Sequence, residues 1–404
     1  MLFSILAYPP SGTPFIDHHS AFFSLLAIYS LLLGIYNERK IYWILIPLFL
    51  GLAFLSKQVP SSYIILSIGF VLILYSFIKK KIDCLIYFSI SSIIFILIIL
   101  IFGKFQGIRL SVFFDQYIFY PQTIGQERYQ DLNFSFRGVI GHFKFVYFAI
   151  IPLFLISIRN FFSNNNYIQN KDFYLFLILI FLTASFIFHQ MLTKNQTFIF
   201  FLIPILTAFS HIKLNKSNLK YKDFLYFIII FLCLFATLKY HLRFNENRKF
   251  HDLENINFQL SSDANKIDKK LSGLNWITYE FKNDPDEEIK MINQIQSYLR
   301  NDSRNKMLIT NYSFFATILN EKTFSPSRVY AGDGTTNPIK GNKYVPKYKK
   351  LMIDLIKKNN ISVIYITVPL DDSNIYDYIG KNCFEEINVP EGLKGYEIRD
   401  CDEI

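Results

Sequence analysis

Long apolar runs between residues 20 and 240 are the feature that most limits what this chain can fold into. A helix needs roughly 17 to 25 apolar residues to cross a bilayer, and these runs reach that length. Residues 241 to 404 read instead as an ordinary charged globular sequence. Of the 404 residues, 51% are hydrophobic, which is too apolar for a soluble protein in which 18% are charged. The sequence therefore predicts a polytopic α-helical membrane domain over 1–240 and a soluble domain over 241–404.

We expect about eight transmembrane helices, with a long external loop at 104–142 between the fourth and the fifth. The candidate spans cover residues 20–36, 41–56, 61–78, 82–103, 143–158, 172–189, 196–212 and 223–239. The second and the fifth are short, and they contain Pro47 and Pro152. Kinks or partial re-entry stay open for these two spans.

Basic residues in short loops predict the orientation of the spans, because such loops are retained on the cytoplasmic side. Alternation along the chain brings four basic loops to one face. They contain Arg39 and Lys40, Lys79 to Lys81, Arg159 and Lys171, and Lys213 to Lys222. The formal net charge of +10 is thus explained by membrane topology, and no nucleic-acid partner is predicted. The N-terminal part of the first span, the turns near 56–60 and 192–196, the 104–142 loop and the whole tail fall outside.

The tail has the pattern of a small α/β domain. Residues 286–300 place Ile289, Ile292, Ile295 and Leu299 on one helical face, and a strand follows at 306–310. A second helix near 346–358 precedes an apolar strand at 361–368, and shorter strands follow near 383–389 and 395–400. This order predicts a partly parallel sheet. No GxGxxG or GxxxxGK[ST] motif supports nucleotide binding.

The four cysteines show no metal-ligand spacing. Cys84 and Cys233 lie within apolar runs, and Cys383 and Cys401 lie in the tail. A metal or redox centre built on cysteine is therefore not expected. Cys383 and Cys401 can pair if the tail lies in an oxidising compartment.

An acid and two imidazoles precede the first span on the outer face, in the sequence FIDHHSAFF. Ionisable residues at membrane depth are costly and are often functional. Asp17 is a candidate ligand of a metal or phosphate, or an orienting group; His18 and His19 are candidate acids, bases or ligands. The alternative is an interfacial polar cap on the start of a helix.

Lys57 is an exception to the distribution of basic residues, since it is the lone strong cation of a short external turn in GLAFLSKQVPSSY. A lysine held there can neutralise a lipid-linked phosphate or pyrophosphate, and Gln58 can add hydrogen bonds. The alternative is a lysine that reaches to the lipid head groups.

Two further outer segments carry candidate substrate-binding residues. Lys194, Asn195 and Gln196 follow His189 and Gln190 in a polar turn that suits sugar hydroxyls or phosphate oxygens, or that is simply hydrophilic. Glu127 and Arg128 lie in an aromatic-rich stretch of the 104–142 loop. Aromatic faces with planar polar groups are typical of carbohydrate sites, but interfacial aromatic belts have the same composition. The pair could equally be solvated.

On these residues the chain resembles the GT-C superfamily of lipid-phospho-sugar glycosyltransferases. The resemblance is to the family 39 type, which includes protein mannosyltransferases and the aminoarabinose transferase of lipid A. It rests on an external acid before a span, here Asp17, and on the family's GLAxLxK pattern, here Gly51 to Lys57. It covers residues 10 to 240, and the external α/β tail matches the family layout.

The resemblance implies inverting transfer of a sugar from a polyprenyl-phosphate donor to a glycan, lipid or protein acceptor of the cell envelope, lipopolysaccharide included. Lys57 would lie near the lipid phosphate and Asp17 would line the same cavity. The location would be the cell inner membrane, with the tail in the periplasm. Family members carry further spans and an acidic external loop upstream of the Asp17 position, so this sequence is expected to lack the N-terminal spans, and the catalytic residue is left unassigned.

The sequence leaves two other functions open: a transporter or flippase of polysaccharide or lipid-linked sugar, and a non-catalytic membrane subunit. Transporters usually carry charges in mid-span and inverted repeats, whereas here the charges gather at one interface. No motif names a cofactor, and a divalent metal ion also stays open. The donor sugar and the acceptor cannot be read from the sequence.

Overall fold

The structure is a computed structural model that describes residues 1–7, 16–130, 132, 134–164, 166–193, 199–247, 253, 255–312, 314–327, 330, 334, 336–367, 375–380 and 383–399. The chain forms two compact units. The first comprises Met1–Leu110 and Gly125–His251, and the second comprises Ser111–Ile124 and Asp252–Ile404.

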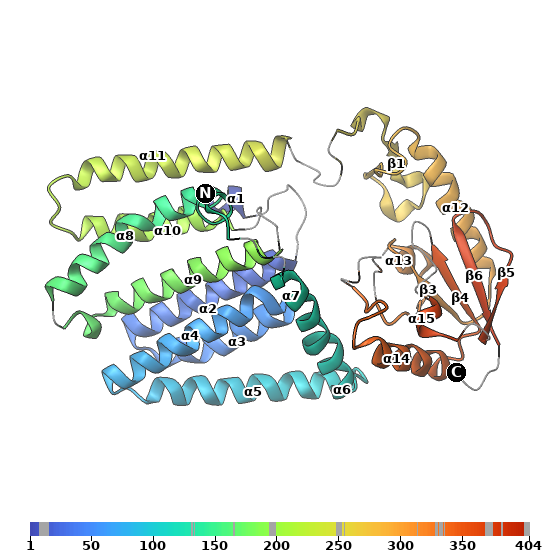
Figure 1. Ribbon diagram of the computed structural model, residues 1–404, viewed down its shortest axis with the longest axis horizontal. Helices are drawn as coiled ribbons and strands as arrows, with labels where there is room; N and C mark the ends of the chain where they lie inside the picture. Colours follow the sequence, from blue (N-terminus) through green and yellow to red (C-terminus); the bar gives the residue numbers. More distant parts are fainter. Residues whose placement is uncertain are drawn as a thin grey trace. The chain divides into compact units, whose positions relative to one another are not determined.

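The first unit is a helical domain, in which α2, α3, α4 and α9 pack together and α8, α10 and α11 pack together (Figure 1). Its longer helices are α2 (Ile16–Asn37), α3 (Lys40–Ser56), α4 (Gln58–Lys79), α5 (Asp83–Phe105), α8 (Lys144–Ser163), α9 (Lys171–Thr193), α10 (Leu202–Asn215) and α11 (Lys222–His241). Short helices complete it: α1 (Leu2–Leu6), η2 (Arg137–Gly141), η3 (Tyr167–Gln169) and η4 (Leu242–Asn247).

Each of the eight predicted spans overlaps one of these longer helices, and the span predicted at 196–212 does so from Leu202 onward. Within the described part of the chain, six helices are long and apolar enough to cross a membrane: α2, α4, α5, α8, α9 and α11 with its extension to Phe244. Helix α3 has 17 residues and α10 has 14. These six helices support a multi-pass membrane domain. The number of eight transmembrane helices stays a prediction.

Close helix packing explains two glycines of the first unit. A Cβ atom on Gly34 would lie 2.9 Å from the ring of Trp43, so this glycine lets α2 and α3 approach. A Cβ atom on Gly51 would lie 2.1 Å from the ring of Phe95, so the second glycine lets α5 pack on α3. The first residue of the GLAFLSK motif therefore has a packing role.

The basic loops predicted to share one face do come together. Glu38 forms ion pairs with Lys81 and, at 3.2 Å, with Lys171. Asp172 accepts a hydrogen bond from the Tyr36 hydroxyl at 2.5 Å and forms an ion pair with Lys213. These contacts join the loops that follow α2 and α4 to the start of α9 and the end of α10. We call this end of the domain the lysine end.

The Asp172–Lys213 pair is expected to be the stronger support of the lysine end, because the Lys213 side chain is only 5% exposed. Substituting Asp172→Ala leaves a buried ammonium without its partner, which costs about 3 kcal/mol of unfolding free energy. The matched control is Glu38→Ala, whose pair with Lys81 is 45% and 43% exposed and contributes less than about 1 kcal/mol. Unfolding in detergent can be followed through Trp43 in a Trp276→Phe background. Equal losses for the two variants would contradict this ranking.

The second unit contains a four-stranded sheet in the order β3-β4-β6-β5. Its strands are β3 (Lys306–Ile309), β4 (Val363–Thr367), β5 (Phe384–Ile387) and β6 (Leu393–Ile398), and a separate antiparallel pair is formed by β1 (Ser262–Asp263) and β2 (Asn275–Trp276). Strands β3 and β4 are parallel, whereas β6 is antiparallel to β4 and β5. The predicted partly parallel sheet is therefore confirmed.

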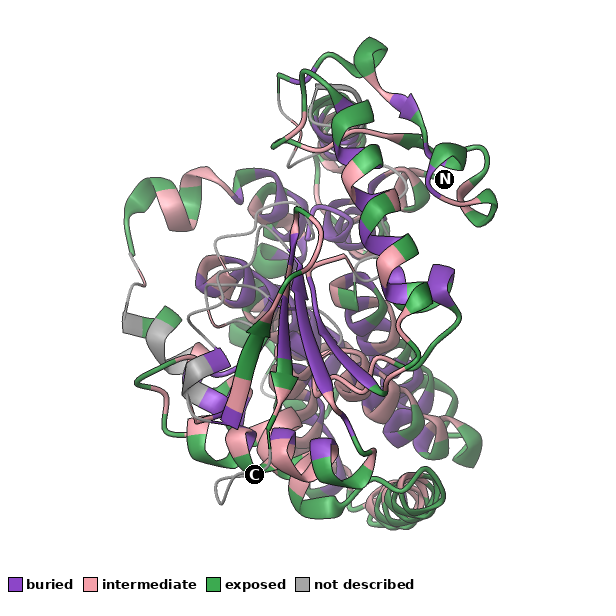
Figure 2. Ribbon diagram, turned by 90° about the vertical axis from the view of Figure 1, so that its right-hand side faces the viewer, coloured by how far each residue is buried: buried purple, intermediate pink, exposed green. Residues whose placement is uncertain are grey.

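Helices cover both faces of this sheet, and strands β3 and β4 are buried along their whole length (Figures 1 and 2). Helices α12 (Pro285–Asn301) and α13 (Phe315–Leu319) pack on the face formed by Leu308, Val363 and Tyr365. Helices α14 (Val345–Lys358) and α15 (Ile375–Tyr378) pack on the other face. The alternation follows from the two-residue period of a strand. Short 3-10 turns occur at η6 (Phe258–Leu260), η7 (Ala264–Lys266) and η8 (Lys269–Leu271).

The segment 104–142, predicted as an external loop between two spans, is largely helical. It contains the end of α5, then α6 (Leu110–Phe113), η1 (Phe114–Phe119), α7 (Tyr120–Gln130) and η2. Ser111–Ile124 docks within the second unit. Asn342 donates a hydrogen bond to Thr123 at 2.9 Å, and Lys347 pairs with Asp115 at 2.5 Å. The sequence did not predict this attachment, because it depends on contacts more than 200 residues apart.

The tail is expected to lose stability in acid through Asp302. Partial burial alone would raise the pKa of Asp302, but hydrogen bonds from Arg304 (Nε to Oδ1, 2.9 Å) and from the Tyr365 hydroxyl outweigh it and hold the pKa below its usual 3.8. A carboxylate with a lowered pKa stabilises the fold above its unfolded-state pKa, and this contribution is lost as the pH falls through the folded-state pKa.

At pH 7 we therefore expect Asp302→Asn to destabilise the tail by about 1 kcal/mol, and the gap to the wild type to shrink as the pH falls below 3.8. Thermal unfolding of the full chain, followed through Trp276 in a Trp43→Phe background, measures the gap. Glu386→Gln is the control, because Glu386 is exposed on β5. A gap that stays constant down to pH 3 would contradict the assignment.

Candidate functional site

Lys57 lies at a break between two apolar helices. Its backbone is extended, with φ −159° and ψ 133°, so that α3 ends at Ser56 and α4 begins at Gln58. Pro60 lacks an N–H and fits in a helix only near the start, which agrees with a new helix beginning here. The Lys57 carbonyl accepts hydrogen bonds from the hydroxyl of Ser61 at 2.5 Å and from that of Ser20 at 3.3 Å.

Three ionisable side chains that are far apart in the sequence meet at this break. Lys57 Nζ lies 2.5 Å from Asp17 Oδ1, and His189 Nε2 lies 3.3 Å from the same oxygen. Asp17 belongs to the first turn of α2, and His189 to the last turns of α9. We call these three residues the Asp17 cluster. It lies at the end of α2, α4 and α9 opposite the lysine end.

Exposure differs across the Asp17 cluster. The Lys57 side chain is 27% exposed, that of Asp17 is 14% exposed, and that of His189 is 2% exposed. Solvent or a ligand therefore reaches the ammonium first and the imidazole last. An ammonium that is open to the outside while its counter-ion is more buried is a suitable partner for an incoming anion.

His189 holds Asp17 from the buried side. For a neutral imidazole to donate to a carboxylate through Nε2, the proton lies on Nε2 and Nδ1 is an acceptor. Among the described residues, this Nδ1 atom has no hydrogen-bond partner. The amide atoms of the adjacent Gln190, which is 1% exposed, likewise have no partner within the described ranges. Within the described residues, buried hydrogen-bonding atoms of His189 and Gln190 thus lie beside the ion pair without a partner.

The other residues predicted on α2 and α4 take separate positions. His18 is fully buried and its ring lies 6.2 Å from that of Phe22. His19 is exposed on the first turns of α2. Gln58 begins α4, and its carbonyl accepts a hydrogen bond from Ser62 at 2.6 Å. The structure therefore brings together Asp17 and Lys57, and it places His18 in an aromatic environment.

Of the predicted substrate-binding residues, Arg128 can be placed near the cluster. It lies on α7, is exposed, and is close enough to act electrostatically on His189. Glu127 lies on the same helix, but its side chain is outside what the structure describes. Lys194, Asn195 and Gln196 lie outside the described residues.

The sequence predicts that the span ends at His189 and that a polar turn begins there, and the predicted end of the helix is wrong. Helix α9 continues to Thr193, so His189 and Gln190 lie within it and face inward. The signal was present in part, because apolar residues continue on both sides of His189 at helical spacing. What the sequence could not supply was its contact with Asp17, which lies 172 residues away.

The described residues include no group of three or more His, Cys, Asp and Glu side chains that could hold a metal ion. Asp17 and His189 are of the residue types that bind metal ions, and they lie close together. The Asp17 carboxylate, however, is already paired with Lys57 on its more exposed side. The arrangement is suited to binding an anion at the ammonium.

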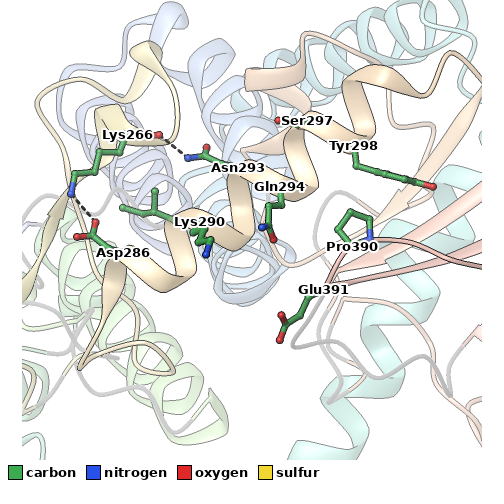
Figure 3. A pocket seen from close by; sticks show the side chains of 10 residues that line it. Lys266, Asp286, Lys290, Asn293, Gln294, Ser297, Tyr298, Pro390 and Glu391 are labelled. Atoms are coloured by element: carbon green, nitrogen blue, oxygen red, sulfur yellow. Dashed lines mark hydrogen bonds and ion pairs between the residues drawn. The ribbon is translucent and has the colours of Figure 1, made fainter.

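A concave surface of the second unit is lined by α12 together with Lys266, Pro390 and Glu391 (Figure 3). It is a groove of about 920 Å³. Its polar groups partly satisfy one another, since Lys266 pairs with Asp286 at 2.7 Å and Asn293 donates to the Lys266 carbonyl at 3.0 Å. Lys290 and Glu391, also in its lining, add one charge of each sign. The groove contains none of the predicted site residues, so the Asp17 cluster remains the candidate site.

Comparison of the chain with protein-family models, with curated protein sequences and with solved structures found no match.

Proposed function

We propose that this chain is a membrane glycosyltransferase, or part of one, that uses a polyprenyl-phosphate sugar donor. The observation that carries the proposal is the Asp17 cluster, in which a partly exposed ammonium lies at a helix break between two apolar helices. A lipid-linked phosphate keeps its hydrocarbon chain in the bilayer and its charge at the interface, so its phosphate arrives where Lys57 lies.

The charges of the site agree with this ligand. Among the side chains that the structure describes, Lys57 and Asp17 balance each other, and Arg128 adds a positive charge that acts on His189. The phosphodiester of a polyprenyl-phosphate sugar carries one negative charge, which matches that excess. Gln190 adds buried amide groups of the kind that hydrogen-bond sugar hydroxyls.

In the proposed reaction, a hydroxyl oxygen of the acceptor attacks the anomeric carbon of the donor sugar. The bond from that carbon to the phosphate oxygen breaks, and the polyprenyl phosphate leaves with the electron pair. A carboxylate takes the proton of the acceptor hydroxyl. Lys57 stabilises the negative charge that grows on the leaving phosphate. The base is not assigned to a residue of this chain.

We further propose that the Asp17 cluster and the tail lie on the periplasmic side of the inner membrane. The basic loops gathered at the lysine end support this orientation, because they are the ones retained inside. Helix α11 begins at the lysine end, so the chain leaves the helical domain at the opposite end and continues into the tail. Cys383 is disulfide-bonded, as is common in oxidising compartments, whereas Cys84 and Cys233 are free. Cys401 lies outside the described residues. The acceptor would be a glycan, lipid or protein of the envelope.

The role of Lys57 is tested by substitution. In membrane vesicles that carry a radiolabelled polyprenyl-phosphate sugar, Lys57→Ala should reduce transfer of label to acceptors about 100-fold or more, because the leaving phosphate loses its counter-charge. Lys81→Ala at the lysine end is the matched control and should transfer normally. Full transfer by Lys57→Ala would refute the proposal. If the wild-type chain binds undecaprenyl phosphate but transfers no label, a transporter is favoured instead.

Orientation has its own test in the accessibility of single added cysteines. Ser272→Cys places a thiol on an exposed residue of the tail, and Ser163→Cys places one on the exposed residue that ends α8. In cells with a permeabilised outer membrane, we expect a membrane-impermeant maleimide to label the first variant strongly and the second only after lysis. The unsubstituted chain is the background control. The reverse pattern would place the tail in the cytoplasm.

A further inference from the structure

The ammonium that is proposed to receive the lipid phosphate already has a counter-ion. Asp17 lies 2.5 Å from Lys57 Nζ, so an arriving phosphate meets an ion pair and not a free cation. Two anions cannot both hold one ammonium at hydrogen-bond distance without repelling each other. Phosphate binding must therefore either displace Asp17 from Lys57 or overcome the repulsion between the phosphate and the Asp17 carboxylate.

We infer that Asp17 is an exchangeable counter-ion of the site: it leaves Lys57 for His189 when a lipid phosphate binds, and it returns when the phosphate departs. This inference rests on the proposed role of Lys57 in phosphate binding. It assigns to Asp17 a positioning role and to His189 the role of its alternative partner.

The contacts of Asp17 provide the means for such an exchange. The same oxygen, Oδ1, lies 2.5 Å from Lys57 and 3.3 Å from His189. The longer contact is near the limit of a hydrogen bond and can tighten once the ammonium is withdrawn. A short rotation of the carboxylate is therefore enough, and the carboxylate does not become an unpaired buried charge.

The burial of the three side chains gives the exchange a direction. Exposure falls from 27% at Lys57 to 14% at Asp17 and 2% at His189. The phosphate therefore approaches Lys57 from the open side, and Asp17 can yield only toward the buried imidazole. A structural ion pair that served only to join α2 to the α3–α4 break would have no need of a second partner behind the carboxylate.

Exchange also helps the product to leave. The donor is a phosphodiester with one negative charge, whereas the released polyprenyl phosphate is a monoester that carries about −1.5 to −2 at pH 7. The product would thus bind a bare lysine more tightly than the donor does. The return of Asp17 to Lys57 competes with the product and limits this retention.

The test measures binding of undecaprenyl phosphate to the purified full chain in nanodiscs. Asp17→Asn removes the competing charge and keeps the size of the side chain, so it should tighten binding about tenfold and make undecaprenyl phosphate a correspondingly stronger inhibitor of transfer. Asp17→Glu keeps the charge and is the matched control; its affinity should stay near that of the wild type. If Asp17 is only a structural partner or a ligand-binding group, Asp17→Asn weakens binding or leaves it unchanged, which would overturn the inference.

A double-mutant cycle tests His189 separately. His189→Phe keeps a ring but removes the alternative partner of Asp17, so binding should weaken about tenfold in the wild-type background and stay unchanged in the Asp17→Asn background. Equal effects in both backgrounds would contradict the exchange. If Asp17→Asn does not insert into the membrane, Asp17→Ser supplies the neutral variant. If His189→Phe in the wild-type background does not change binding of undecaprenyl phosphate, that result alone rejects the inference.

Failure of this inference can be told from failure of the proposed function. If Lys57→Ala binds undecaprenyl phosphate as the wild type does, the phosphate role of Lys57 is wrong. If Lys57→Ala loses binding while Asp17→Asn gains none, the phosphate role stands and the exchange is wrong. Trp43 fluorescence in a Trp276→Phe background shows that each variant remains folded.

Discussion

Charged side chains in an apolar helical domain are stable only when they are paired or reach the interface, and this constraint organises the first unit. The ion pairs described here gather at opposite ends of the helices, with the Asp17 cluster at one end and the pairs of Glu38 and Asp172 at the other. Helices α2 and α9 contribute to both ends. Their polar residues therefore fix where the apolar stretch of each helix begins and stops.

The two ends differ in how their ion pairs are built. At the lysine end, the Lys213 side chain is nearly buried and pairs with Asp172, and Asp172 also accepts a hydrogen bond from the Tyr36 hydroxyl. In the Asp17 cluster the ammonium is the most exposed member and the imidazole is the most buried. An enclosed cation is suited to holding helices together, whereas an open one with a buried reserve partner is suited to binding an anion.

Much of this architecture was predictable from local sequence, and the rest depended on distant contacts. The long apolar runs located the helices, and the short apolar runs at 306–310 and 361–368 located two strands of the sheet. Asp17 and Lys57 could be selected because a charge beside an apolar span is costly. The partnership of His189 with Asp17 could not, since no local pattern reports a contact across 172 residues. The docking of Ser111–Ile124 was missed for the same reason.

A structure of the full chain, determined with undecaprenyl phosphate in a lipid nanodisc, tests the exchange of Asp17 most directly. We expect the phosphate within hydrogen-bond distance of Lys57 Nζ, with the Asp17 carboxylate turned from the ammonium to His189 Nε2. A phosphate bound elsewhere on the chain, with the Asp17–Lys57 pair intact, would contradict this expectation.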